Sequence, residues 1–164
     1  MILIVVKSYH HKNTEKIAKV FTEVLNAPLK TPEQISPEEF EEYDLIGLGS
    51  GIYGGKHHIE LLNLVDNLPQ VTNKKAFIFS TDGAPRGLIK YDPSFTDEIL
   101  LKNHSLLREK LQSKGYIIVD EFNCGGFNTN KFLKLFGGIN KGRPNAEDLK
   151  YAEEFAQNLK LNFI

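Results

Sequence analysis

Five apolar stretches alternate with segments in which apolar side chains recur at helical spacing. The stretches predict strands of a buried sheet, and the segments between them predict amphipathic helices. The predicted strands are residues 2–6, 27–31, 44–49, 75–80 and 116–122. The predicted helical patterns cover residues 17–25, 59–65, 106–111 and 149–159. Pro28 restricts the second strand to an edge of the sheet, because proline cannot donate a ladder hydrogen bond.

This alternation predicts an α/β fold, a three-layer doubly wound sandwich with a five-stranded parallel sheet. A first strand at residue 2 and five strands in all fit the order 2-1-3-4-5. In that order the switch point lies between the first and third strands, and ligands bind beyond the carboxyl ends of the strands. We therefore expect residues 8–14, 50–58 and 81–104 to meet there as three loops.

Local signals place several element ends. Gly115 is typical of a helix C-terminal stop before the last strand. Asn145 is the expected N-cap of the last helix, with Pro144 before it and Asp148 at the third helical position. The acidic segment 37–43 is expected to form a solvated helical turn before the third strand.

Length and composition favour one compact unit. The 164 residues, 41% of them hydrophobic, suit a single domain over residues 1–164. A net charge of −1 with both signs interspersed gives no basic footprint for nucleic acid. No apolar run approaches the roughly 20 residues of a membrane span, and the start lacks signal-peptide features, so a cytoplasmic location is expected. The oligomeric state stays open.

The first loop has the composition of an anion-binding site. Ser8, Lys12, Asn13 and Thr14 offer donors directly before the first helix. Unpaired backbone N–H groups and the positive end of the helix dipole also point into such a loop. This pattern predicts binding of a phosphorylated cofactor.

The run Asn13-Thr14-Glu15-Lys16-Ile17-Ala18 after a hydroxyl-containing loop resembles the FMN-phosphate loop of flavodoxins. Thr14 falls in register with the last threonine of the family pattern. Tyr9 and His11 stand at its first two hydroxyl positions, and Lys12 stands at its glycine. The resemblance implies FMN as the cofactor. The expected FMN contacts in this loop are Ser8, His10, His11, Lys12, Asn13 and Thr14.

The second loop combines three glycines with one aromatic side chain. Glycine lets a backbone approach a flat ligand and opens positive φ, and an aromatic ring can stack on an isoalloxazine. By resemblance to flavodoxins, Tyr53 stacks on the flavin and the Gly54-Gly55 peptide lies beside flavin N5. The expected contacts in this loop are Gly51, Ile52, Tyr53, Gly54 and Gly55.

The third loop begins with Thr81, Asp82 and Gly83, which by the same resemblance cradle the pyrimidine end of the flavin. Asp82 either lies near flavin N1, where its charge lowers the potential, or satisfies its own backbone in a turn. A connection as long as residues 81–104 is typical of functional segments. The side chains that either cover the flavin or pack on the surface are Arg86, Lys90, Tyr91, Asp92 and Phe95.

Two histidine pairs and a single cysteine could also take part in chemistry, but their sequence patterns are weak signals. The pairs His10-His11 and His57-His58 lack the partners and spacing of a metal site, and we expect no metal. Cys124, the only cysteine, is interpreted as a small buried residue at a strand end in preference to a reactive thiol near the cofactor. The segments Cys124-Gly125-Gly126-Phe127 and Gly142-Arg143-Pro144-Asn145 resemble flavodoxin-like proteins of bacteria and archaea.

Three functions follow from these patterns. The first is an FMN-binding flavodoxin-like electron-transfer protein that serves a redox partner protein or a small-molecule acceptor. The alternative is a small FMN-dependent oxidoreductase acting on a quinone, a porphyrinogen or another soluble acceptor. Its support is the long third loop and a near-neutral charge unlike that of acidic flavodoxins. A further alternative is a flavodoxin fold without FMN that serves as an interaction module.

Overall fold

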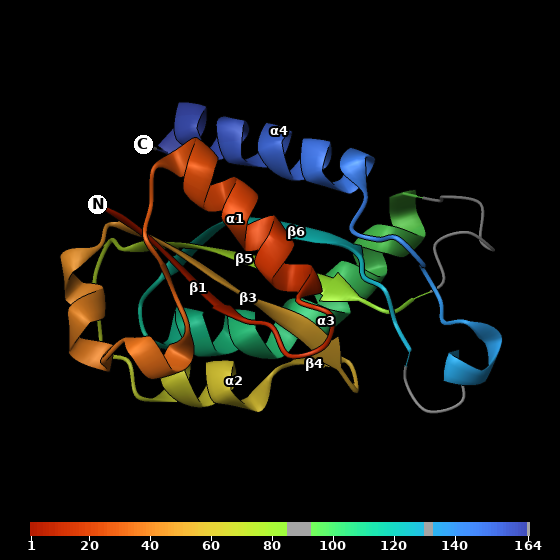
Figure 1. Cartoon of the computed structure of the whole chain (residues 1–164). Helices are drawn as coiled ribbons and strands as arrows, with labels where there is room; N and C mark the ends of the chain where they lie inside the picture. Colours follow the sequence, from red (N-terminus) through yellow and green to blue (C-terminus); the bar gives the residue numbers. More distant parts are fainter. Residues whose placement is uncertain (85–92, 130–132, 164) are drawn as a thin grey trace.

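The computed structural model describes residues 1–84, 93–129 and 133–163 and has a central parallel sheet (Figure 1). The parallel strands are β1 (Ile2–Lys7), β2 (Leu29–Lys30), β3 (Leu45–Tyr53), β5 (Lys75–Asp82) and β6 (Ile117–Gly125). Their order is β2-β1-β3-β5-β6, with β2 at one edge. This order is 2-1-3-4-5 when the parallel strands alone are numbered, so the predicted topology is confirmed.

One short strand was not predicted. Strand β4 (Lys56–His57) pairs antiparallel with β3 through Ile52↔His57 and Tyr53↔Lys56. The expectation of a loop over residues 50–58 is therefore wrong at both ends of that segment. The chain reverses at Gly54-Gly55, and the returning strand gives the end of β3 a hydrogen-bonding partner that its own sequence does not reveal.

Strands β5 and β6 also run further than their apolar patterns. Thr81 and Asp82, expected in a loop, lie in β5 and pair with Cys124 and Gly125 of β6. Each strand supplies the partner that extends the other. Cys124 is buried and packs in the core, which confirms the structural interpretation of this residue.

Two helices cover each face of the sheet (Figure 1). Helices α1 (Asn13–Leu25) and α4 (Ala146–Phe163) lie on one face, and α2 (Ile59–Asp66) and α3 (Pro93–Ser113) lie on the other. A separate hydrophobic cluster fills each interface. Phe21 is central to the first, and Ile46, Leu61 and Leu107 are fully buried in the second.

The local signals of the sequence act as expected. Gly115 has φ +91°, and a Cβ there would lie 2.0 Å from the carbonyl oxygen of Val71, so only glycine fits. Asn145 and Asp148 exchange two hydrogen bonds of 3.0 and 2.9 Å as a capping box at the start of α4. The acidic segment forms a 3-10 helix over Pro37–Glu42.

The segment after β5 differs from its prediction. Helix α3 begins at Pro93, so residues 93–104 are helical and not part of a long loop. Proline is favoured in the first turn of a helix, where its missing N–H costs nothing. Arg86, Lys90, Tyr91 and Asp92 lie outside the described residues, and so does the side chain of Phe95. No helix among the described residues is long and apolar enough to cross a membrane.

Candidate functional site

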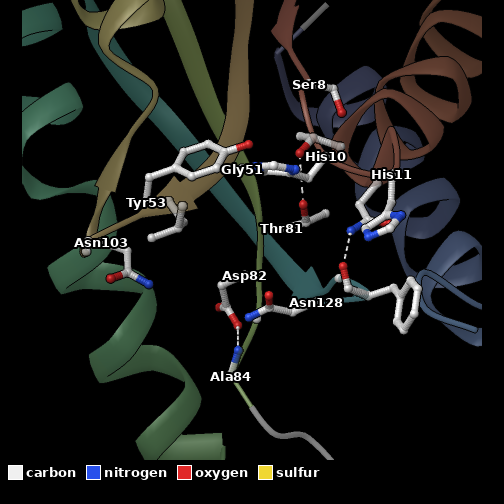
Figure 2. A pocket seen from close by; sticks show the side chains of 18 of the residues that line it. Ser8, His10, His11, Gly51, Tyr53, Thr81, Asp82, Ala84, Asn103 and Asn128 are labelled. Carbon is white, nitrogen blue, oxygen red and sulfur yellow. Dashed lines mark hydrogen bonds between the residues drawn. The ribbon is translucent and has the colours of Figure 1, made fainter. Parts of the chain in front are cut away.

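A pocket of about 650 Å³ lies at the carboxyl ends of β1, β3, β5 and β6 (Figure 2). It is formed where the three predicted loops meet, at the switch point between β1 and β3. Every predicted contact residue except Lys12 lines it. These residues are Ser8, His10, His11, Asn13, Thr14, Gly51, Ile52, Tyr53, Gly54, Gly55, Thr81, Asp82 and Gly83.

The first loop carries backbone N–H groups that have no backbone carbonyl of the described residues as partner. His11 and Lys12 both have left-handed backbones, with φ of 53° and 51°. Within the described part of the chain, no backbone N–H of residues 9–12 donates to a backbone carbonyl. The Lys12 side chain instead lies outside the pocket and is 3.6 Å from Glu15. Successive N–H groups in such a turn, next to a helix N-terminus, are an arrangement that can accommodate an anion.

Ser8 and Thr14 place hydroxyl groups at the floor of this loop. The Ser8 Oγ atom is buried and has no hydrogen-bond partner among the residues that the structure describes. Thr14 Oγ1 lies 2.8 Å from Thr81 Oγ1, and both side chains are buried. This bond ties the start of α1 to the end of β5, and one of the two hydroxyls keeps a hydrogen for a ligand.

The sequence predicts that the Asn13 side chain donates to a phosphate, but in the structure its amide nitrogen is directed at Phe127. Its Nδ2 donates one of its two hydrogens to the carbonyl oxygen of Phe127 at 2.9 Å, which orients the amide toward that residue. Its Oδ1 is buried without a partner. The side chain therefore presents an acceptor, which suits a ligand hydroxyl and does not suit a phosphate oxygen.

Tyr53 is the last residue of β3, and its side chain lies near His10 of the first loop. Its ring centroid is 6.1 Å from that of His10 and 5.5 Å from that of His58. Burial raises the pKa of the Tyr53 hydroxyl, and the backbone N–H groups of His10 and Tyr9 oppose that rise. A Cβ at Gly51 would lie 3.0 Å from the phenol oxygen of Tyr53, so glycine at this position allows the Tyr53 ring to pack over the backbone.

The turn between β3 and β4 consists of two glycines with positive φ, 58° at Gly54 and 77° at Gly55. No heavy atom lies within 4 Å of a Cβ built on Gly54, so that position has open space. The positive φ, not crowding, accounts for glycine here. A peptide in such a turn is free to present its N–H or its carbonyl to a ligand.

Asp82 serves its own backbone, since its Oδ1 accepts from the N–H of Ala84 at 2.9 Å (Figure 2). That is the turn interpretation of this residue, and its effect on a flavin stays a prediction. Gly83 permits close packing, because a Cβ there would lie 2.2 Å from Nδ2 of Asn128.

One wall of the pocket was not predicted from the sequence. It consists of Gly126, Phe127, Asn128 and Thr129. His11 contacts this wall twice, with Nε2 2.8 Å from Thr129 Oγ1 and with its ring 4.7 Å from that of Phe127. The Gly125-Gly126 pair after the last strand was the available signal, because it lies at the same sheet edge as the three loops.

Helix α3 supplies further lining that no motif indicated. Ile99 and Asn103 line the pocket from α3, and a Cβ built on Gly55 would lie 3.8 Å from Asn103 Oδ1. Ala84, which follows Gly83, also lines the pocket. Figure 2 shows Asn103 across the pocket from the first loop. These positions depend on the start of α3 at Pro93, which the expected loop excluded.

The four histidines of the two pairs do not gather into one group, although His10 and His58 both contact the Tyr53 ring. His10 packs on Tyr53 and His11 on Phe127, while His57 faces His104 and His58 faces Tyr53. Among the described residues, no group of three or more His, Cys, Asp or Glu side chains is placed to hold a metal ion.

Comparison with known proteins identifies the family. A flavodoxin domain model matches residues 3–123. An uncharacterized protein of Methanocaldococcus jannaschii is 49% identical over 162 residues, covering 98% of each chain. Oxidised flavodoxin 2 of Bacillus cereus aligns with a TM-score of 0.68 at 21% identity, covering 99% of each chain. Fusobacterium nucleatum flavodoxin bound to flavin mononucleotide aligns with a TM-score of 0.64 at 14% identity, also covering 99% of each chain. This chain belongs to the flavodoxin family.

Proposed function

We propose that this protein binds FMN and transfers single electrons between partners. The observation that carries this proposal is the buried, unpartnered hydroxyl of Ser8 beside the N–H groups of His11 and Lys12, which donate to no backbone carbonyl of the described residues. A buried polar atom without a partner is costly, and a phosphate oxygen in the loop removes that cost.

The remaining parts of FMN match other parts of the pocket. The buried Oδ1 of Asn13 accepts a hydrogen bond from a hydroxyl of the ribityl chain. The flat wall at Gly51, Gly54 and Gly55 admits the ring, with Tyr53 placed to stack on it. Bound FMN supplies reversible one- and two-electron transfer, and the chain supplies binding, orientation and control of the potential. The FMN-bound flavodoxin of Fusobacterium nucleatum supports the same assignment.

A second candidate is an FMN-dependent oxidoreductase acting on a quinone, a porphyrinogen or another soluble acceptor. A net charge of −1 favours it, because that charge provides little steering toward a basic redox protein. The lining by Ile99 and Asn103 also extends the pocket toward α3, beside the glycine turn. Rapid reduction of quinones with a nicotinamide donor would establish this function in place of the carrier. The third candidate, an interaction module without FMN, predicts a colourless protein.

The absorbance spectrum of the protein purified without added cofactor tests FMN binding directly. Flavin bands are expected, and they exclude the interaction module. Titration of the apoprotein with FMN and riboflavin then tests the phosphate site. FMN should bind at least tenfold more tightly, and equal affinities would contradict the role of the first loop.

The Ser8→Ala variant separates ligand binding from stability. Removing an unpartnered buried hydroxyl should leave the free energy of unfolding of the apoprotein unchanged or raised. FMN binding should weaken by about 1–3 kcal/mol, the value of a hydrogen bond to a charged group, and riboflavin binding should stay the same. Denaturant unfolding and flavin titration measure the two effects.

Thr14→Ala is the matched comparison, because its hydroxyl already bonds Thr81. This variant should lose about 1 kcal/mol of apoprotein stability as well as FMN affinity. If Ser8→Ala bound FMN as tightly as the natural protein, the phosphate would have to lie elsewhere.

A further inference from the structure

A chain of buried polar side chains lies behind the glycine turn, on the α3 side of the sheet. It begins at Ser50 and His57 in the β3–β4 hairpin and continues to His104 on α3. All three side chains are at most 3% exposed. None of them lines the pocket, so cofactor binding as proposed does not use them.

Ser50 joins the two strands of the hairpin. Its Oγ accepts from the backbone N–H of His58 at 2.9 Å and lies 3.0 Å from Nδ1 of His57. The same hydroxyl lies 2.8 Å from the carbonyl oxygen of Gly51, which lines the pocket. Strand β4 has only two residues, so these side-chain bonds hold much of the hairpin in register.

His104 anchors the chain to the rest of the fold. Its Nε2 is 2.7 Å from Ser80 Oγ, and its Nδ1 is 2.8 Å from Glu121. Arg108 also bonds Glu121, through Nη2 at 2.8 Å. Both nitrogens of the His104 ring are thus occupied, and its position is set by β5, β6 and α3 together.

His57 packs on this fixed ring but has one free nitrogen. The two ring centroids are 4.9 Å apart, and Nε2 of His57 is buried without a partner. Burial, and then the nearby His104, hold the pKa of His57 well below its usual range. The titratable group packed against it is His104. Among the described residues no carboxylate bonds His57, since Glu121 bonds His104 and Arg108, so a proton on His57 finds no counter-ion.

We propose that His57 is a positioning residue for the flavin ring, which holds the Gly54-Gly55 turn through Ser50 as a neutral imidazole and releases it on gaining a proton. A buried imidazolium without a partner is unstable, so protonation drives the side chain toward water. Because β4 carries His57, the turn moves with it. This inference rests on the proposed FMN function only for its consequence at the ring.

The positioning role can be tested first without any flavin. His57→Phe keeps the ring volume and removes the bond to Ser50, whereas His57→Asn keeps a polar atom at the Nδ1 position and does not titrate. Hydrogen exchange of the His58 amide reports on the hairpin, because this amide donates to Ser50. Its protection should fall about tenfold in His57→Phe and stay near the natural value in His57→Asn.

Leu159→Ala is the control for general destabilisation, since Leu159 is fully buried between α4 and the opposite face of the sheet. It should lower the free energy of unfolding and leave the protection of the His58 amide unchanged. An equal loss of protection in Leu159→Ala and His57→Phe would mean that His58 exchanges only by global unfolding. That result would overturn the proposal.

Riboflavin titrations against pH test the consequence at the ring, because riboflavin has no phosphate of its own to titrate. In the natural protein its affinity should fall about tenfold once the pH drops well below about 6.5, the ordinary pKa of histidine. In His57→Asn this loss should be absent, while neutral-pH affinity is retained. The same acid loss in both proteins would overturn the role of His57.

The two proposals can fail separately. A natural protein that binds neither FMN nor riboflavin contradicts the proposed function, yet the His58 exchange experiment still decides whether His57 positions the turn. Conversely, tight FMN binding would support the proposed function, while unchanged protection of the His58 amide in His57→Phe would contradict the positioning role of His57.

Discussion

Replacement of Phe21 by alanine should lower the free energy of unfolding by about 3–5 kcal/mol. The Phe21 ring is fully buried on α1 and packs against four other aromatic rings. Its centroid lies 5.1 Å from Phe79 and 5.6 Å from each of Phe77, Phe122 and Phe155. Three of these contacts are edge-on, the arrangement that favours aromatic pairs beyond their buried area.

The loss should be near the upper end of that range, because the surrounding rings come from β5, β6 and α4 and cannot collapse into the cavity. Denaturant unfolding of the apoprotein measures it, with Leu161→Ala as the control. Leu161 is 82% exposed on α4, and its replacement should change stability by less than about 0.5 kcal/mol. A loss below 2 kcal/mol for Phe21→Ala would show that the cluster repacks.

This variant also links the core to the site. Phe21 presses α1 onto the sheet, and the N-terminal end of α1 carries Asn13 and Thr14. A ligand that binds only the folded chain raises its apparent stability by mass action. Excess FMN should therefore recover part of the lost stability in Phe21→Ala, and riboflavin should recover less.

Replacement of Glu121 by alanine should lower stability by about 3 kcal/mol, because it leaves Arg108 and His104 without their shared carboxylate. The side chain of Glu121 is 13% exposed, so water compensates little. Glu121→Gln keeps the shape and one acceptor and should lose about half as much. The exposed Glu109, on the next position of α3 after Arg108, provides the control Glu109→Ala, with a change below about 0.5 kcal/mol.

The effect of Glu121 should depend on pH. Burial alone raises the pKa of this carboxyl, but its bonds to His104 and Arg108 outweigh burial and lower it. The stabilisation is therefore complete above the ordinary pKa of about 4.5 and is lost as the pH falls through the lower folded value. Unfolding measured from neutral to acid pH should show the natural protein and Glu121→Gln converging. A constant difference would contradict the ionic interaction.

Local chemistry of the sequence determined the fold class. The run at residues 2–6 is too apolar for any position except a strand buried on both faces, and the 3.6-residue spacing after it allows only a helix. Asn145, Asp148 and Gly115 set element ends through contacts within a few residues. Parallel strands with right-handed crossovers then leave few possible orders, which is why the order could be inferred without any contact information.

The same reasoning located the pocket, because the carboxyl ends of parallel strands meet at one edge whatever their side chains are. Thus Ser8, Thr14, Gly51 and Thr81 could be assigned to one site from their positions along the chain alone. Their assignment as FMN contacts stays a prediction until flavin binding is measured.

Only the tertiary structure decided which polar atoms face a ligand. The Asn13 amide is oriented by its hydrogen bond to Phe127, which lies 114 positions further along the chain, and the wall at Phe127–Thr129 closes the pocket beside His11. The burial of His57 follows from its pairing with Ile52 and its packing on His104. Such contacts depend on register and on residues distant in sequence, and hydrophobic periodicity carries no information about either.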